Sequence, residues 1–350
     1  MIPPPFLKKF LLAASVLVTL VFGACDSKEK LYLYNWTYYT PHDVIEKFED
    51  EYNCEVIYDD FDSNETMYAK IQTGGSNWDI IFPSGDYTSI MIKNDMLEKI
   101  DKSRLSNLGN IDPELLQRVT YDPDMEYSVP YYWGAAGICL NKSKIPSYEQ
   151  SWSIFGRSDL AGKMTMLDDM REVMGDALIF LGYSVNSTDL DEIAAARDLI
   201  EKTWKPNLGR FDSDSFGKNY ASGAFWLVQG YPESVFREIQ GNKELEENTV
   251  FFIPQEGGSA YIDSMCILKG AKNIDLAHKF IDFMHRPNIY AEFCDTFRFP
   301  STVNIPARVL LKKKPMYNIS DLMKTELKED VGPALDIYID AWLDTIRVGG

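Results

Sequence analysis

Strand-like and helix-like apolar patterns alternate along most of this 350-residue chain. The segments 31–34 and 54–61 are typical of strands, and between them apolar residues recur at helical spacing from Val44 to Tyr52. We expect Thr40 to cap this helix, with Pro41 at its first position. Further helices are predicted over 171–181 and 190–204, with strands between and after them. Such alternation predicts an α/β fold.

A long apolar stretch that contains glycine, SVPYYWGAAGICLN at 128–141, interrupts this alternation. It is typical of a pair of strands, and a second unit of strands and helices follows from about residue 141. The chain is long enough to build two domains with separate cores. A chain that builds one lobe, crosses to a second and returns forms a cleft between them, which is the usual place for a ligand.

The first residues are typical of a targeting segment. Lys8 and Lys9 precede an apolar run over 10–22 that is too short to span a bilayer comfortably, and the run ends in VFGAC. This pattern resembles a bacterial lipoprotein signal: it predicts a signal peptide over 1–24, lipidation of Cys25 and a polar tether over 25–30. A plain secretory signal or an uncleaved anchor is the alternative, and each of the three implies export.

The formal net charge of −18 makes nucleic acid a poor partner and a cation a good one. Four cysteines lie beyond Cys25, none of them in a CxxC pair and all among apolar residues. We interpret them as small buried side chains rather than as a disulfide framework.

Motifs for catalysis are missing from the sequence. It contains no GxSxG, HExxH, GxGxxG after a strand, or P-loop. Of the three histidines, His42 and His285 are interpreted as surface or helix-cap residues. The sequence DSDSFG at 212–217 begins like a calcium loop, but its twelfth position is Gly223. We therefore predict a protein that is not an enzyme and that has no metal or cofactor.

Aromatic and acidic residues gather at the ends of predicted strands and helices. Trp36 and Tyr39 follow the first strand, at a corner where α/β proteins bind ligands. Asp169 and Glu172 are three apart at a helix start, which is also the spacing of a capping box. Tyr261 and Asp263 share one face of a strand, whose alternative interpretation is an edge or rim position.

Several motifs in order, LYLYNWTYY, SNETMYAKI, VPYYWGAAG, DDMREV, LGYSVNSTD, EGGSAYIDS and EDVG, resemble the spermidine/putrescine-binding proteins of polyamine ABC transporters. The resemblance covers residues 30–345. It implies a two-lobed periplasmic substrate-binding protein with a hinge and an interdomain cleft. We expect lobe 1 to comprise 31–137 and 264–305, lobe 2 to comprise 138–263 and 306–350, and the hinge to lie at 134–137 and 259–264.

The resemblance also implies the ligand contacts. It assigns an aromatic wall to Trp36, Tyr39 and Tyr261, hydroxyl contacts to Thr37 and Ser84, and ammonium-binding carboxylates to Asp169, Glu172 and Asp263. Ammonium groups favour carboxylates and ring faces, and methylene chains favour flat aromatic walls.

The sequence departs from the family pattern at a few of these positions. Asp86 stands where relatives carry an aromatic residue, and Tyr231 is our choice for a wall residue that replaces a tryptophan. Tyr38 replaces an acid and Lys328 replaces an amide, changes that remove acceptors and add a positive charge. We therefore expect putrescine, the shorter diamine, to be preferred over spermidine.

The expected partners are a polyamine, an ABC permease with its cytoplasmic ATPase, and a membrane through the lipid anchor. We expect a monomer in the periplasm, anchored to a bacterial membrane. Two other interpretations stay open: a receptor for another cationic small solute, and a surface lipoprotein without a transport role. An amino acid ligand needs an arginine for its carboxylate, and Arg171, the nearest to the acidic pair, is expected to point elsewhere on its helix.

Overall fold

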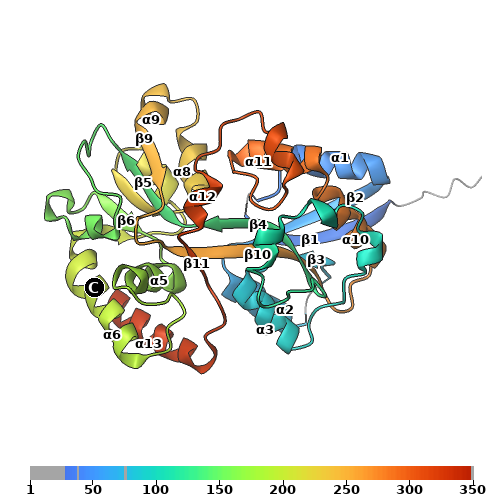
Figure 1. The fold of residues 1–350 in the computed structure, drawn as a ribbon, viewed down its shortest axis with the longest axis horizontal. Coiled ribbons are helices and arrows are strands. Elements are labelled where there is room, and N and C mark those ends of the chain that lie inside the picture. The colour runs from blue at the N-terminus through green and yellow to red at the C-terminus, as the bar shows by residue number, and fades with distance from the viewer. Residues whose placement is uncertain (1–27, 38, 75–76, 348–350) are drawn as a thin grey trace, which may run out of the picture.

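The computed structural model describes residues 28–37, 39–74 and 77–347, and it builds two β-sheets with helices around each (Figure 1). The first sheet has the order β11-β10-β3-β1-β2, with β4 paired to β10. The second has the order β7-β6-β8-β5-β9. Both combine parallel and antiparallel pairs, so the predicted α/β fold is confirmed.

The first sheet consists of β1 (Glu29–Trp36), β2 (Cys54–Phe61), β3 (Ile80–Ile81), β4 (Ser128–Ala135), β10 (Ser259–Ile267) and β11 (Glu326–Leu327). The second consists of β5 (Gly137–Asn141), β6 (Met164–Met166), β7 (Leu208–Phe211), β8 (Leu227–Gly230) and β9 (Thr249–Phe252). Strand β10 has partners on both sides, so the alternative interpretation of its segment as an edge strand is wrong.

The helices divide between the two sheets. Those beside the first are α1 (His42–Tyr52), α2 (Asn64–Gln72), α3 (Gly85–Lys93), α4 (Pro113–Leu116), α10 (Ile274–Met284) and α11 (Pro287–Phe297). Those beside the second are α5 (Met170–Phe180), α6 (Leu190–Leu199), α7 (Phe216–Ala221), α8 (Pro232–Ile239), α9 (Lys243–Asn248) and α13 (Leu335–Arg347). The short α12 (Ile319–Leu322) lies between the two halves in Figure 1. In the described part of the chain, no helix is both long and apolar enough to cross a membrane.

The start of α1 differs from the prediction. Pro41, not Thr40, is the N-cap residue, and it contributes no side-chain cap. The Thr40 hydroxyl instead accepts a hydrogen bond from the Asn35 amide at 2.9 Å and lies 3.1 Å from the Tyr131 hydroxyl. Asn35 and Tyr131 are both fully buried, so their polar groups need partners inside the protein, and Thr40 supplies one.

The chain passes between the sheets at three places. Ala136 separates β4 of the first sheet from β5 of the second, residues 253–258 lead from β9 back to β10, and residues 328–334 lead from β11 to α13. Strands β4 and β10 cross the middle of the molecule in Figure 1. Strand β10 continues through residues 263 and 264, where a lobe boundary was expected, with a bulge between them.

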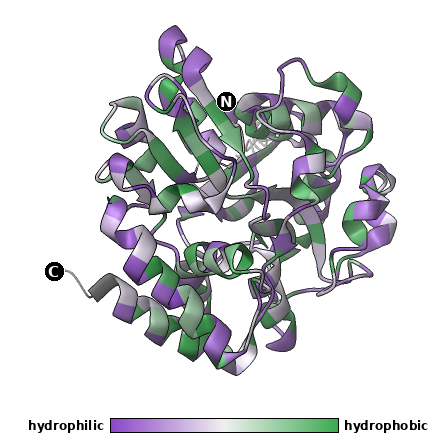
Figure 2. Ribbon diagram, turned by 60° about the vertical axis from the view of Figure 1, so that its left-hand side comes forward, coloured by the Kyte–Doolittle hydropathy of each residue, from purple (hydrophilic) through white to green (hydrophobic). Residues whose placement is uncertain are grey.

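Each sheet has its own apolar core. One is built on β1, β4, β10, α10 and α11 and includes Tyr317 and Leu322, and the other is built on β5, β6, α5 and α6. Figure 2 shows that the strands are largely hydrophobic whereas the surface helices carry both kinds of residue. Cys54, Cys139, Cys266 and Cys294 are free and buried, which confirms their interpretation as packed apolar side chains.

Candidate functional site

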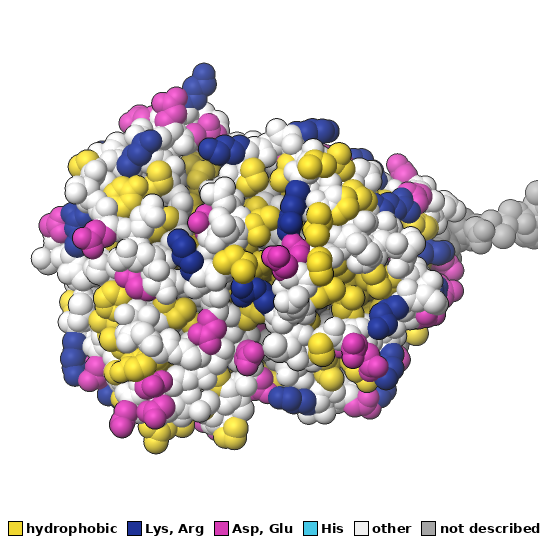
Figure 3. All heavy atoms as spheres, viewed as in Figure 1, with side chains coloured by type: hydrophobic (Ala, Val, Ile, Leu, Met, Phe, Trp, Pro, Cys, Tyr) yellow, Lys and Arg dark blue, Asp and Glu magenta, His cyan; other side chains and the backbone are white. Residues whose placement is uncertain are grey.

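A cavity of about 820 Å³ lies between the two sheets and is lined by residues from both. Its deep part carries buried Asp86 and Asp263, while its basic residues Arg237, Lys313 and Lys314 are exposed. Elsewhere, on the face drawn in Figure 3, positive and negative side chains are interspersed. The buried Arg171 and the largely buried Lys328 side chain also line the cavity, so its deep part contains charges of both signs.

Nine of the ten predicted ligand-binding residues line this cavity: Trp36, Thr37, Tyr39, Ser84, Asp86, Asp169, Tyr231, Tyr261 and Asp263. They come from four strand or helix ends and from the interior of β10, which are distant in sequence. Glu172 is not among the lining residues. Tyr38 and the expected lipidation site Cys25 lie outside the described residues.

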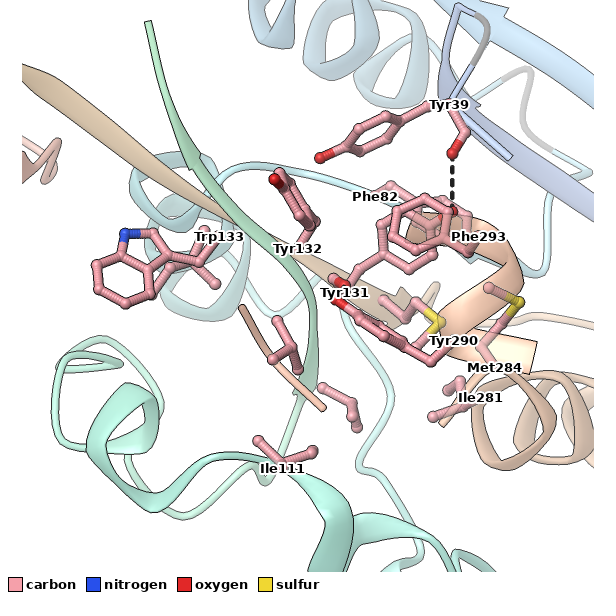
Figure 4. Close-up of a cluster of buried hydrophobic side chains, with 14 of the residues drawn as sticks. Tyr39, Phe82, Ile111, Tyr131, Tyr132, Trp133, Ile281, Met284, Tyr290 and Phe293 are labelled. Atoms are coloured by element: carbon pink, nitrogen blue, oxygen red, sulfur yellow. Dashed lines mark hydrogen bonds between the residues drawn. The ribbon is translucent and has the colours of Figure 1, made fainter. Parts of the chain in front are cut away.

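Aromatic rings form two walls of the cavity. On the side of the first sheet, the indole N–H of Trp36 donates to the carbonyl of Phe82 at 2.9 Å, which holds the ring in place. Tyr39 is 6 % exposed, and the Tyr131 hydroxyl donates to its carbonyl at 2.8 Å (Figure 4). Tyr231, at the start of α8, meets Tyr261 of β10 edge to face, with ring centroids 5.7 Å apart. These walls suit an alkyl chain or a cation.

Asp263 is the most deeply buried acid that lines the cavity, with 3 % exposure. It accepts a hydrogen bond from the Ser84 hydroxyl at 2.7 Å, and Ser84 in turn is held by Asn64 through its backbone N–H and its hydroxyl, both at 3.2 Å. Burial raises the pKa of Asp263 to about 7, although the Ser84 hydrogen bond opposes this shift. The carboxyl group is therefore only partly ionised near pH 7 while no cation is bound.

Asp86 and Asp169 reach the cavity from helices on opposite sides. Asp86 lies in the first turn of α3, is 7 % exposed, and its buried Oδ1 has no hydrogen-bond partner among the described residues. Asp169 is the N-cap of α5 and accepts from the backbone N–H of Glu172 at 3.0 Å. Asp169 is thus confirmed as an N-cap, but the reciprocal bond of a capping box is absent, because the Glu172 side chain bonds to Lys328 and Tyr231 instead. The second oxygen of Asp169 is left for another donor.

Glu172 lies behind the cavity surface, in contrast to the expectation that it would share a ligand ammonium with Asp169. Its Oε1 forms an ion pair with Lys328 and accepts a hydrogen bond from the Tyr231 hydroxyl at 3.1 Å. Burial lowers the pKa of Lys328, but the charges of Glu172, Asp169 and Asp86 outweigh burial and raise it overall. The cavity thus already contains one ammonium group, which belongs to Lys328.

Two lining residues were missed or misplaced by the sequence analysis. Glu233, in the first turn of α8, lines the cavity, but its sequence context PESV gave no signal beyond helix capping. Arg171 also lines the cavity, so the expectation that it points elsewhere is wrong. Its guanidinium donates to the Glu329 carbonyl at 3.1 Å and to the Asn186 side chain at 3.0 Å.

Two further observations concern metal-ligand side chains and His285. Within residues 28–37, 39–74 and 77–347, no cluster of three or more ligand-type side chains could hold a metal ion. His285 is fully buried rather than exposed, and neither ring nitrogen has a hydrogen-bond partner there. Burial lowers its pKa to about 4, so it is not the cationic helix cap that was expected.

Comparison with known proteins gives consistent results. The family model for bacterial extracellular solute-binding proteins matches residues 43–318. The spermidine/putrescine-binding periplasmic protein of Salmonella typhimurium is 39% identical, over 94% of this chain and 95% of that protein. The putrescine-binding periplasmic protein PotF of Escherichia coli is 32% identical, over 82% of each chain. The crystal structure of the Tp0655 (TpPotD) lipoprotein of Treponema pallidum superposes with a TM-score of 0.88 at 51% identity, covering 91% of this chain and 99% of that one.

Proposed function

This chain belongs to the bacterial extracellular solute-binding protein family, and we propose that it binds a polyamine and delivers it to an ABC transporter. Because its relatives are solute-binding proteins, the chain is a binding protein rather than an enzyme. The permease and its ATPase are the partners that the proposal requires.

The observation that carries the proposal is the pairing of buried, cation-free carboxylate oxygens with aromatic walls. Asp86 and Asp263 are both less than 10 % exposed. A buried carboxylate is costly unless a cation pairs with it, and an alkyl diammonium supplies two cations and an apolar linker. Trp36, Tyr39 and Tyr261 provide the flat surfaces on which methylene groups pack.

A zwitterionic ligand fits the same cavity less well. Its carboxylate would require a cation, yet Lys328 is paired with Glu172, and two of the three Arg171 nitrogens donate to Glu329 and Asn186. Only the buried Arg171 Nε has no partner among the described residues. The deep cavity therefore favours a ligand that carries only positive charge.

Isothermal titration of the purified protein with putrescine, spermidine and the neutral butane-1,4-diol tests the proposal. Both amines should bind and the diol should not. Asp263→Asn should weaken amine binding about 30-fold or more, because truncating one partner of a buried charge pair costs at least ~2 kcal/mol. Asp336→Asn, an exposed acid on α13, is the matched control. Wild-type protein that binds neither amine would refute the function.

We further propose that putrescine is preferred over spermidine. Lys328 places an ammonium among Glu172, Asp169 and Asp86, where the third ammonium of a longer polyamine would otherwise be accepted. Like charges that share a site repel each other strongly when water is excluded. Spermidine bound about ten-fold tighter than putrescine would contradict this preference.

Closure of the two halves over the ligand is part of the proposal. We assign lobe 1 to 29–135 and 259–327 and lobe 2 to 137–258 and 328–347, a division that moves residues 259–263 and 306–327 from the expected lobe 2 to lobe 1. Arg298, after α11, lies over the ring of Phe236 on α8 at 5.2 Å and so joins the halves at the cavity rim. Small-angle scattering should detect a more compact molecule when putrescine is added, and an unchanged radius would argue against closure.

Lipid anchoring through Cys25 and a periplasmic location complete the proposal. The signal-like sequence that ends in VFGAC supports it, as does the name of the T. pallidum neighbour, which is called a lipoprotein. Expression in a bacterium with labelled palmitate tests it: wild-type protein should carry label and partition into detergent, and Cys25→Ser should do neither. Unlabelled wild-type protein would favour a plain secretory signal.

A further inference from the structure

Glu233 is an acidic residue of the cavity that no family motif indicated. It is the second residue of α8, after Pro232, and this helix start follows directly on the wall residue Tyr231. Its side chain lines the cavity, and its Oε2 is buried without a hydrogen-bond partner in the described part of the chain. A buried carboxylate oxygen without a donor is expensive, so its presence requires an explanation.

The second lobe contributes Glu233, and the first lobe contributes the neighbouring acid, Asp263 on β10. The charges of Glu233 and Asp263 both raise the pKa of the Tyr261 hydroxyl, and Tyr261 lines the cavity. Burial, with a contribution from the charge of Asp263, raises the pKa of Glu233 to about 7. The two carboxyl groups therefore disfavour each other's ionisation while the cavity holds no cation.

We propose that Glu233 and Asp263 form a carboxylate pair across the two lobes that receives one ammonium group of the ligand. This inference rests on the proposed polyamine-binding function and adds a ligand-binding residue to it. An ammonium has three N–H donors, and the free Oε2 of Glu233 and the second oxygen of Asp263 offer acceptors from opposite sides. The ligand then acts as the bridge that brings the lobes together.

A second pair of cavity acids also comes from the two lobes. Asp86 comes from α3 beside the first sheet, and Asp169 comes from the start of α5 beside the second. Both act electrostatically on Lys328, which already supplies an ammonium beside them. The ligand ammonium is therefore directed to Glu233 and Asp263, whose shared site holds, in the described part of the chain, no protein cation as close as the one that pairs with Glu172.

Other charged groups face the proposed pair. Arg237, one turn along α8, lowers the pKa of Glu233, whereas Asp86 raises that of Asp263 and Lys328 lowers it. These neighbours do not outweigh burial, so both acids titrate near neutrality in the empty cavity. When an ammonium binds between them they ionise, and the displaced proton passes to the buffer.

Calorimetry with Glu233→Gln tests the pair. This substitution preserves the shape of the side chain and removes its charge, and we expect putrescine affinity to fall about ten-fold or more. Glu238→Gln, on the same helix but not lining the cavity, removes the same charge and should change affinity less than about two-fold. Glu233→Asp keeps the charge and should retain more affinity than Glu233→Gln.

Proton release provides a second measurement that a merely structural role would not affect. Titrations at pH 7 in phosphate and in Tris report the protons released per ligand, and Glu233→Gln should release fewer than wild type. If wild type binds putrescine and Glu233→Gln matches it in affinity and proton release, the pair is refuted while the polyamine function stands. If wild type binds no polyamine, the proposed function itself fails.

Discussion

The Lys328 ammonium forms an ion pair with the Glu172 carboxylate in a site where the two side chains are 8% and 0% exposed. Lys328 follows β11, whereas Glu172 lies in the first turn of α5, so the pair joins the segment that leaves the first sheet to a helix of the second half. A buried ion pair stabilises little relative to apolar residues, but the loss of one partner is costly. The pair fixes the Lys328 ammonium near Asp86 and Asp169, which line the cavity.

Replacing Lys328 alone should therefore destabilise the protein. Lys328→Met leaves Glu172 buried without its counter-ion, and we expect the free energy of unfolding to fall by about 3 kcal/mol. The double variant Glu172→Gln, Lys328→Met should recover most of this loss, because neither charge remains. Urea unfolding followed by circular dichroism measures both. Equal stability of the single and double variants would show that the pair is not coupled.

Ligand-free stability should depend on the protonation of Asp263. Its folded-state pKa of about 7 lies above the ordinary value of 3.8, so the folded state binds more protons than the unfolded state between these values. Its contribution is therefore fully present below pH 3.8 and is lost as the pH rises through 7, by up to about 4 kcal/mol. Asp263→Asn should reduce this decline between pH 5 and pH 8 in urea unfolding.

The control for that experiment is Asp336→Asn, which should leave the decline unchanged because Asp336 is exposed. In the Asp263→Asn variant, part of the decline in stability with pH should remain, because the pKa of Glu233 is also raised to about 7. A slope identical to that of the wild type would mean that Asp263 is ionised in the empty cavity.

His285 should make the fold sensitive to acid in the opposite sense. Burial lowers its pKa from 6.5 to about 4, so the unfolded state binds the extra proton between these values. Stability is therefore fully present above pH 6.5 and falls as the pH drops toward 4, by up to about 3 kcal/mol. His285→Phe should keep the stacking on Tyr290, remain within about 1 kcal/mol of wild type at pH 7.5, and lose much of the decline at pH 5. An undiminished decline in the variant would exclude His285 as its source.

Gly175 should be required for the contact between α5 and the start of β10. A Cβ at this position would lie 2.3 Å from the Ser259 hydroxyl oxygen, with the next neighbours at 3.5 Å and beyond. Gly175→Ala should destabilise by about 1–3 kcal/mol through overpacking. Adding Ser259→Ala should restore stability, since that hydroxyl is itself buried without a partner in the described residues. Thermal unfolding of the four proteins in this cycle would show whether the clash is local, and failure of the double variant to recover would contradict the assigned contact.

Much of the architecture could be predicted from local pattern. Strand β2 spans the predicted residues 54–61, and α5 begins and ends within one residue of the predicted 171–181. Strand β1, however, begins at Glu29, inside the expected tether, because Glu29 and Lys30 pair with Cys54 and Glu55 of β2. Periodicity reports which face of an element is apolar, whereas the extent of a strand depends on a partner that is distant in sequence.

The sequence by itself determined the class of fold, the crossing at 134–137 and nine of the residues that line the cavity, because these follow from apolar spacing and from a recognisable order of motifs. Only the tertiary structure decided how the charges are used. It paired Lys328 with Glu172, buried His285, and brought Glu233 into the cavity that Asp263 lines. Electrostatic roles depend on burial and on neighbours in space, and neither is encoded in the identity or spacing of a single charged residue.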